Sequence, residues 1–139
     1  MESAPQYVHL APGACPPTLQ TSPTRVIVVL DQPVDPGWQH LVSRWLIEIG
    51  CLYMLAWGPT CSSWDDSVDM ANLEAFDYAE IPAECNALTT WHADEPLYEC
   101  MWFAKNCAVH SIVPLYRTSI IHIGPIAREC ELLRAYAEA

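Results

Sequence analysis

The sequence has very few positive charges. Six Lys and Arg stand against 17 Asp and Glu in 139 residues, so the formal net charge is −11. Between Arg44 and Lys105 there is no Lys or Arg, whereas the same stretch carries eleven acidic residues. Nucleic acids and anionic membranes are bound through Lys and Arg. The composition therefore argues against both as partners, and it favours a basic protein partner reached by electrostatic steering.

The sequence also lacks the short motifs of common cofactor and membrane proteins. It has no Gly-rich nucleotide loop, no C-x-x-C, no H-x-x-x-H and no apolar run of membrane-spanning length. Its seven cysteines are odd in number and irregular in spacing, and no basic, apolar leader opens the chain. We therefore expect reduced thiols, a cytoplasmic location and no bound cofactor.

Length and proline content predict one domain behind an N-terminal arm. A chain of this length forms a single core. Residues 1–24 are rich in proline and are predicted to form an arm, with Tyr7–Leu10 as a possible short edge strand. Residues 25–139 are predicted to form a single α/β domain.

Within that domain, apolar runs alternate with amphipathic segments. Val26–Leu30 is a continuous apolar run, which is typical of a strand buried on both faces. Further strands are predicted at 52–57, 87–91 and 118–123. Helices are predicted from Asp35 to Gly50, from a Ser62 or Ser63 cap to Phe76, from an Asp94 or Glu95 cap through Ala108, and from Ile126 to Tyr136.

This alternation predicts a small three-layer, doubly wound domain of the Rossmann-like or flavodoxin-like class, with a mostly parallel sheet of four to five strands. Counting from Val26–Leu30, we expect the strand order 2-1-3-4. The pattern resembles flavodoxin-like and TIR-like domains in alternation only, and fold alone does not assign an activity.

In parallel sheets, ligands bind beyond the carboxyl ends of the strands. Most of the unusual polar residues fall there: Asp31 after the first predicted strand, Cys61 to Asp66 after the second, and Trp91 to Glu95 after the third. This edge is therefore the predicted functional site. Because helix starts also attract Ser, Asp and Glu, helix capping remains an alternative explanation of the same residues.

One hypothesis is an enzyme at this edge. Cys61 would be the nucleophile, His92 the general base and Asp31 the group that orients it, acting on a neutral or cationic substrate. The neighbouring carboxylates of Asp65 and Asp66 disfavour a thiolate, and the six other cysteines indicate that this chain uses Cys as a small apolar residue.

The preferred hypothesis is a binding protein of regulatory, inhibitor-like or immunity-like character. Its acidic face would attract a basic partner and its aromatic residues would anchor it. The residues predicted to bind are Trp64, Asp65, Asp66, Trp91, Asp94 and Glu95, with Asp69, Glu74, Asp77 and Glu99 contributing charge. Trp64 is the predicted anchor, whereas Trp38, Trp45 and Trp102 fit apolar helix faces and are predicted to be core residues.

Two further alternatives remain open from the sequence. Asp31, Asp65, Asp66, Asp94 and Glu95 could together hold Mg²⁺ or Ca²⁺, which prefer oxygen ligands. The Trp-rich surface could instead support a homo-oligomer.

Overall fold

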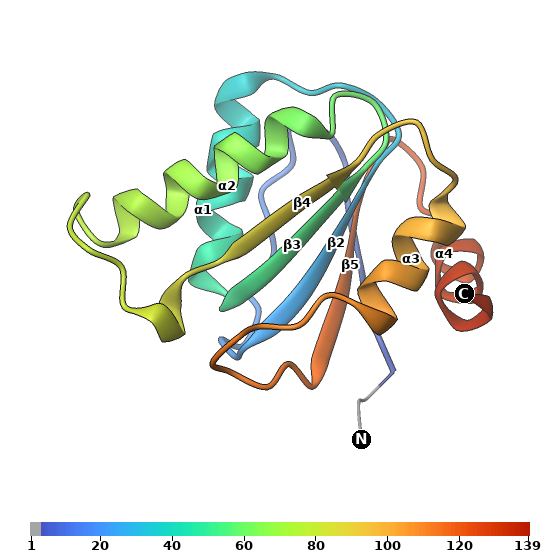
Figure 1. Ribbon diagram of the computed structural model, residues 1–139. Helices are drawn as coiled ribbons and strands as arrows, with labels where there is room; N and C mark the ends of the chain where they lie inside the picture. The colour runs from blue at the N-terminus through green and yellow to red at the C-terminus, as the bar shows by residue number, and fades with distance from the viewer. Residues whose placement is uncertain (1–3) are drawn as a thin grey trace.

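The computed structural model describes residues 4–139, and it forms a five-stranded, all-parallel sheet between two layers of helices (Figure 1). The strands are β1 (Gln6–Leu10), β2 (Thr24–Leu30), β3 (Cys51–Trp57), β4 (Leu88–His92) and β5 (Arg117–Ile123). The helices are α1 (Pro36–Glu48), α2 (Ser62–Ala75), α3 (Leu97–Asn106) and α4 (Glu129–Glu138), with a short 3₁₀ turn at Ala83–Cys85. The predicted α/β class is confirmed.

Burial explains why the helices divide between the two faces. Every residue of β2 is buried, as its continuous apolar run predicts. Its alternate residues enter two cores: Val26 and Val28 pack under α1 and α2, and Ile27 and Val29 pack under α3 and α4. The sheet is therefore covered on both sides, which a parallel sheet requires.

The strand order β1-β5-β2-β3-β4 differs from the predicted one. β5 lies between β1 and β2, whereas the sequence placed it beyond β4. The chain moves outward from β2 to β4 on one face and returns through α3 on the other. The burial of the two strands fits this order: six of the seven residues of β5 are buried, whereas none of the five residues of β4 is buried. A polar strand is tolerated best at an edge.

Two helices start in a different way from the prediction. Ser62 and Ser63 do not cap α2: its N-cap is Cys61, which makes no side-chain cap bond, and the Ser63 hydroxyl donates to the Thr60 carbonyl. Asp94 and Glu95 do not cap α3 either, because Pro96 occupies the N-cap and the Glu95 carboxylate is bonded to His92. The prediction at α1 is confirmed, since the Asp35 carboxylate accepts from the Trp38 N–H.

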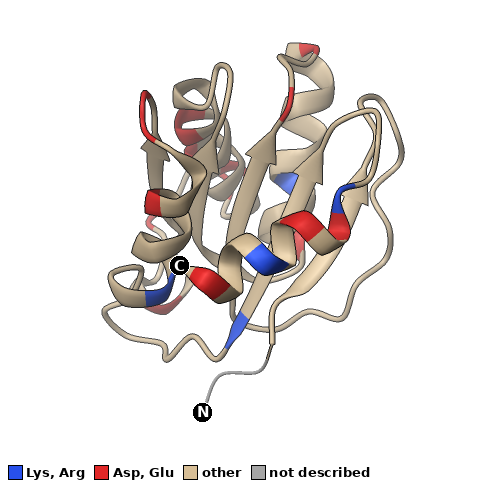
Figure 2. Ribbon diagram, turned by 90° about the vertical axis from the view of Figure 1, so that its right-hand side faces the viewer, with Lys and Arg blue, Asp and Glu red and all other residues tan. Residues whose placement is uncertain are grey.

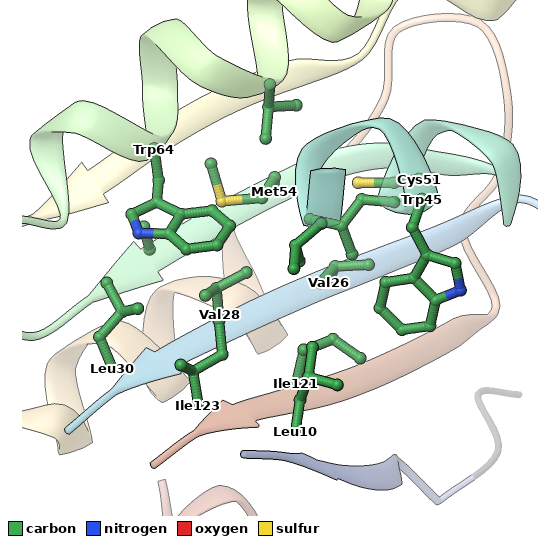
Figure 3. Packing of buried hydrophobic residues seen from close by; sticks show 14 of the residues in the cluster. Leu10, Val26, Val28, Leu30, Trp45, Cys51, Met54, Trp64, Ile121 and Ile123 are labelled. Carbon is green, nitrogen blue, oxygen red and sulfur yellow. The ribbon is translucent and has the colours of Figure 1, made fainter. Parts of the chain in front are cut away.

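Trp64 is a core residue, which overturns its prediction as an exposed anchor. Its side chain is 0% exposed and lies between α2 and the sheet, close to Val28, Leu30 and Met54 (Figure 3). Position explains this result. Trp64 and Val68 are four residues apart, so they share the helix face that points to the core.

The prediction for Trp102 was wrong in the opposite direction. Trp102 was predicted to be a core residue, but it is 46% exposed. The neighbouring Met101 and Ala104 take the buried face of α3 instead. Across residues 4–139, no helix combines the length and the apolar character that crossing a bilayer requires.

Candidate functional site

The carboxyl edge of the sheet holds two separate groups of polar side chains. One surrounds Asp31 at the ends of β2 and β5, and the other surrounds His92 at the ends of β3 and β4. In the strand order, β2 and β4 are separated by β3, and adjacent strands lie about 4.8 Å apart. Asp31 therefore belongs to a different part of the edge from His92.

Asp31 lies in a hydrogen-bonded ring that joins β1, β2, β5 and the start of α4. His122 Nε2 lies 2.7 Å from Asp31 Oδ2, and Tyr7 Oη lies 2.7 Å from His122 Nδ1. The Arg128 backbone N–H donates to Tyr7 Oη, and its guanidinium donates to Asp31 Oδ1 at 2.6 Å. Gly124 leaves room for this ring, since a Cβ there would stand 2.3 Å from Asp31 Oδ2.

The ring engages both nitrogens of His122. A carboxylate only accepts, so Nε2 donates to Asp31, and Nδ1 is hydrogen-bonded to the Tyr7 hydroxyl. Both ring nitrogens are then engaged and the side chain is 0% exposed. His122 is therefore placed to hold the sheet and α4 together, and its ring is closed to a substrate.

His92 stands between two adjoining grooves. Its Nδ1 lies 2.5 Å from Glu95 Oε1, its Nε2 lies 3.1 Å from the Thr90 hydroxyl, and its ring makes a T-shaped contact with Phe103. The first groove, which we call the aromatic groove, has a volume of about 390 Å³. It is lined by His92, Glu95, Tyr98, Glu99, Trp102 and Phe103.

The aromatic groove combines exposed rings with carboxylates. Tyr98 and Trp102 are about half exposed and are four residues apart on α3, so they share one helix face. Glu95 and Glu99 have the same spacing. Lys105, at the end of the same helix, is turned away, because its ammonium group donates to the carbonyls of Tyr136 and Ala139. No cation of α3 therefore fills the groove.

The second groove, which we call the loop groove, has a volume of about 340 Å³ and lies where β3 and β4 end. Its lining runs from Trp57 to Ser62 and from His92 to Glu95. Gly58 shapes it: its φ is +112°, and a Cβ there would come within 2.2 Å of the Leu30 carbonyl. Cys61 and His92 both line this groove, but Cys61 is only 3% exposed.

A third polar cluster lies on the other face of β4, where α2 covers it. The Thr89 hydroxyl donates to Asp65 and, at 3.2 Å, to Asp69. Partial burial, and next the negative charge of Asp65, raise the pKa of Asp69. The ionised form of Asp69 is therefore disfavoured in the folded protein.

Asp69→Asn is expected to increase stability at neutral pH, because the amide keeps the contact with Thr89 and removes the repulsion from Asp65. The pKa of Asp69 is raised on folding, so the folded state binds more protons between the unfolded and folded values. The difference in the free energy of unfolding between the variant and the wild type should therefore shrink as the pH falls through that window. Urea denaturation at pH 7 and pH 4 measures this, and a variant less stable than wild type at pH 7 would contradict it.

The structure brings together only part of the predicted site. Cys61, His92, Asp94 and Glu95 line the loop groove, but Asp31 does not, since its carboxylate is held by His122 and Arg128. The side chains proposed as a nucleophile, base and orienting acid therefore do not converge.

The predicted acidic face is also divided. Asp65 and Asp69 approach Thr89, whereas Glu74 lies 3.0 Å from His40 of α1. Trp91 is 49% exposed on β4. Asp66 is exposed, and Asp77 has a positive φ just after α2.

The five carboxylates considered for Mg²⁺ or Ca²⁺ are not gathered. Asp31, Asp65 and Glu95 belong to the three different clusters described above. Over the residues that the structure describes, no three His, Cys, Asp or Glu side chains are close enough to hold an ion.

The sequence missed the aromatic groove because Tyr98, Trp102 and Phe103 resemble core residues by composition. The available signal was the spacing of these residues: Tyr98 and Trp102 are four apart on α3, and Glu99 of the same helix is four residues after Glu95.

A further groove of about 480 Å³ lies at the amino end of the sheet, between residues 21–23, the end of α1 and the end of α2. It is mainly apolar and carries few polar groups. Because ligands of parallel sheets bind at the carboxyl ends of the strands, it is not the candidate site.

The fold and this edge define a three-layer, all-parallel α/β domain with a groove lined by aromatic and acidic side chains. Residues 5–139 match the model of the family described as "Domain of unknown function (DUF7684)", and the chain belongs to that family. No curated protein and no solved structure matches the chain.

Proposed function

We propose that this protein acts by binding, and that it takes Lys or Arg side chains of a basic protein partner in the aromatic groove. The observation that carries the proposal is the lining of that groove: Tyr98, Trp102 and Phe103 supply rings, and Glu95 and Glu99 supply carboxylates. Ammonium and guanidinium groups are attracted to the faces of aromatic rings and to carboxylates.

The charge of the surrounding chain supports the same partner. No Lys or Arg occurs between residues 45 and 104, so the walls of the groove contain no cation that would compete. Figure 2, which shows the side that α3 and α4 cover, has red acidic segments on several elements; blue segments are also present there, but no Lys or Arg lines the aromatic groove. A basic partner would approach such a surface at an enhanced rate.

This proposal moves the anchor from Trp64 to Trp102. The buried Trp64 cannot touch a partner, so the acidic face of α2 loses the anchor that the sequence placed there. Trp102 replaces it with an exposed ring beside two carboxylates. Exposed aromatic residues surrounded by polar groups are frequent binding hot spots.

Binding to an eight-residue peptide of alternating Lys and Ser tests the proposal by calorimetry. Trp102→Ala is expected to weaken binding roughly 2- to 30-fold, because cation–π contacts contribute about 0.5–2 kcal/mol. Glu99→Gln is expected to weaken it by a factor of about 2–5, the range of exposed charge pairs, and the loss should shrink in high salt.

Two variants outside the groove serve as matched controls. Tyr116→Ala removes a ring that is 60% exposed, and Glu138→Gln removes an exposed charge at the end of α4. Both should leave the affinity nearly unchanged. If they weaken binding as much as the groove variants do, or if an alternating Glu and Ser peptide binds equally well, the proposal is wrong.

We also propose that the protein works in a reducing compartment such as the cytoplasm. The irregular positions of its cysteines support this, and Cys51, Cys61 and Cys100 are buried core residues. Burial raises the pKa of the Cys51 and Cys100 thiols to about 12, which keeps them protonated and unreactive.

A further inference from the structure

β4 forms an open edge of the sheet. It pairs with β3 on one side only, and it is the last strand in the order. None of its five residues is buried, and Trp91 is 49% exposed. A strand paired on one side leaves every second N–H and C=O group pointing outward, where another strand can pair with them.

Each face of this edge has its own groove. On the α3 face, His92 leads into the aromatic groove. On the α2 face lies a groove of about 430 Å³, which we call the α2 groove. It is lined by Asp69, Asn72, Leu73, Ile81, Asn86, Ala87, Leu88 and Thr89. The outward edge of β4 therefore runs between two hollows.

Carboxylates stand on both sides of the edge. Asp65 and Asp69 approach Thr89 on the α2 face, and Glu95 and Glu99 line the groove on the α3 face. Asp69 is already crowded by negative charge, since Asp65 contributes to its raised pKa. A cation brought to the α2 groove would relieve this repulsion, because Asp69 lines that groove.

We infer that β4 receives an extended, basic segment of the partner as a sixth strand of the sheet. Successive side chains of a strand point to opposite faces, so Lys or Arg residues an odd number of positions apart in that segment would enter the aromatic groove and the α2 groove in turn. A second copy of this chain is disfavoured as the occupant, because it would bring the same carboxylates and a net charge of −11 to the edge.

The inference rests on the proposed function for the charge of its partner, and it adds the conformation and the place of binding. It also goes beyond the aromatic groove. A cation held only by Trp102 and Glu99 needs no backbone contact, whereas strand addition requires main-chain hydrogen bonds along β4.

Hydrogen exchange at Leu88–His92 tests the inference, with three peptides of equal charge. The first is an extended basic peptide of nine residues with its Lys residues three positions apart, so that they point to opposite faces of the sheet in turn. The second is the same peptide with every second amide N-methylated. The third has its Lys residues at alternate positions, so that all of them point to the same face. The first peptide should slow exchange of the outward-facing β4 amides by about tenfold. The second and third should bind about tenfold more weakly and give no such protection.

The outcomes separate this inference from the proposed function. If all three peptides bind equally and β4 is not protected, strand addition is wrong, whereas binding in the aromatic groove stands provided that Trp102→Ala still weakens it. If none of the peptides binds, both proposals are wrong. If the β4 amides become protected without peptide as the protein concentration rises, the occupant is a second copy and the inference is wrong.

Discussion

Trp64→Ala is expected to lower the free energy of unfolding by about 3–5 kcal/mol, the range found for large aromatic residues in cores. Trp64 is fully buried between α2 and the sheet, so truncation leaves a cavity over Val28 and Met54 (Figure 3). The neighbouring backbone belongs to regular elements and has little freedom to fill the space. Urea denaturation should show the loss as a lower midpoint at an unchanged slope.

Trp64→Phe separates packing from hydrogen bonding at the same position. Among the described residues, the Trp64 indole N–H is a buried donor without a hydrogen-bond partner. Phe removes this donor and keeps most of the ring, so we expect a loss below about 2 kcal/mol. Trp102→Ala is the matched control, because that ring is half exposed. If Trp64→Ala costs no more than Trp102→Ala, the burial described here is wrong.

His122→Ala is expected to lower the free energy of unfolding by about 2–4 kcal/mol. It removes a fully buried ring and leaves the Tyr7 hydroxyl and one Asp31 oxygen without their partner. Tyr7→Phe removes one hydroxyl from the same set of hydrogen bonds and should lower the free energy of unfolding by about 1 kcal/mol. A loss for His122→Ala that is no larger than that for Tyr7→Phe would contradict the arrangement.

The hydrogen bonds around Asp31 also predict that the stability of the fold depends on pH. Burial acts to raise the pKa of Asp31, but hydrogen bonds from His122 and Arg128 outweigh it and lower the pKa below its ordinary value of 3.8. The stabilisation is therefore complete above about pH 4 and is lost as the pH falls through the lowered value. The stability difference between wild type and Asp31→Asn should be largest at neutral pH and should shrink in acid.

The regular elements could be predicted because they depend on local patterns. Val26–Leu30 is apolar without interruption, and β2 is buried on both faces. The cap at Asp35 and the stop at Gly50, where φ is +94°, are also local. The strand order depends on which strand reaches the centre of the sheet, and the alternation of elements does not encode that choice. The polar character of residues 88–92 was the available signal for an edge strand.

The candidate site, like the fold, could be predicted only in part from the sequence. The sequence placed Cys61, His92, Asp94 and Glu95 at one edge of the sheet, and all four line one groove. It could not separate them from Asp31, because each of these residues follows a strand and only the order of the strands sets the distance. The sequence also predicted that Trp64 is exposed and Trp102 is buried, whereas the structure shows the reverse. Both residues lie on amphipathic helices, and only the rotation of each helix against the sheet decides which ring is buried.

By itself, the sequence determined the acidic charge, the parallel α/β class and the gap in positive charge between Arg44 and Lys105, because these follow from composition and local periodicity. Only the tertiary structure decided that β4 lies at an open edge and that Trp102 is exposed beside Glu95 and Glu99. It also decided that Asp31 is held by His122 and Arg128. The physical reason is that side chains distant in the chain meet only after the strands have been ordered and the helices have been packed on their faces.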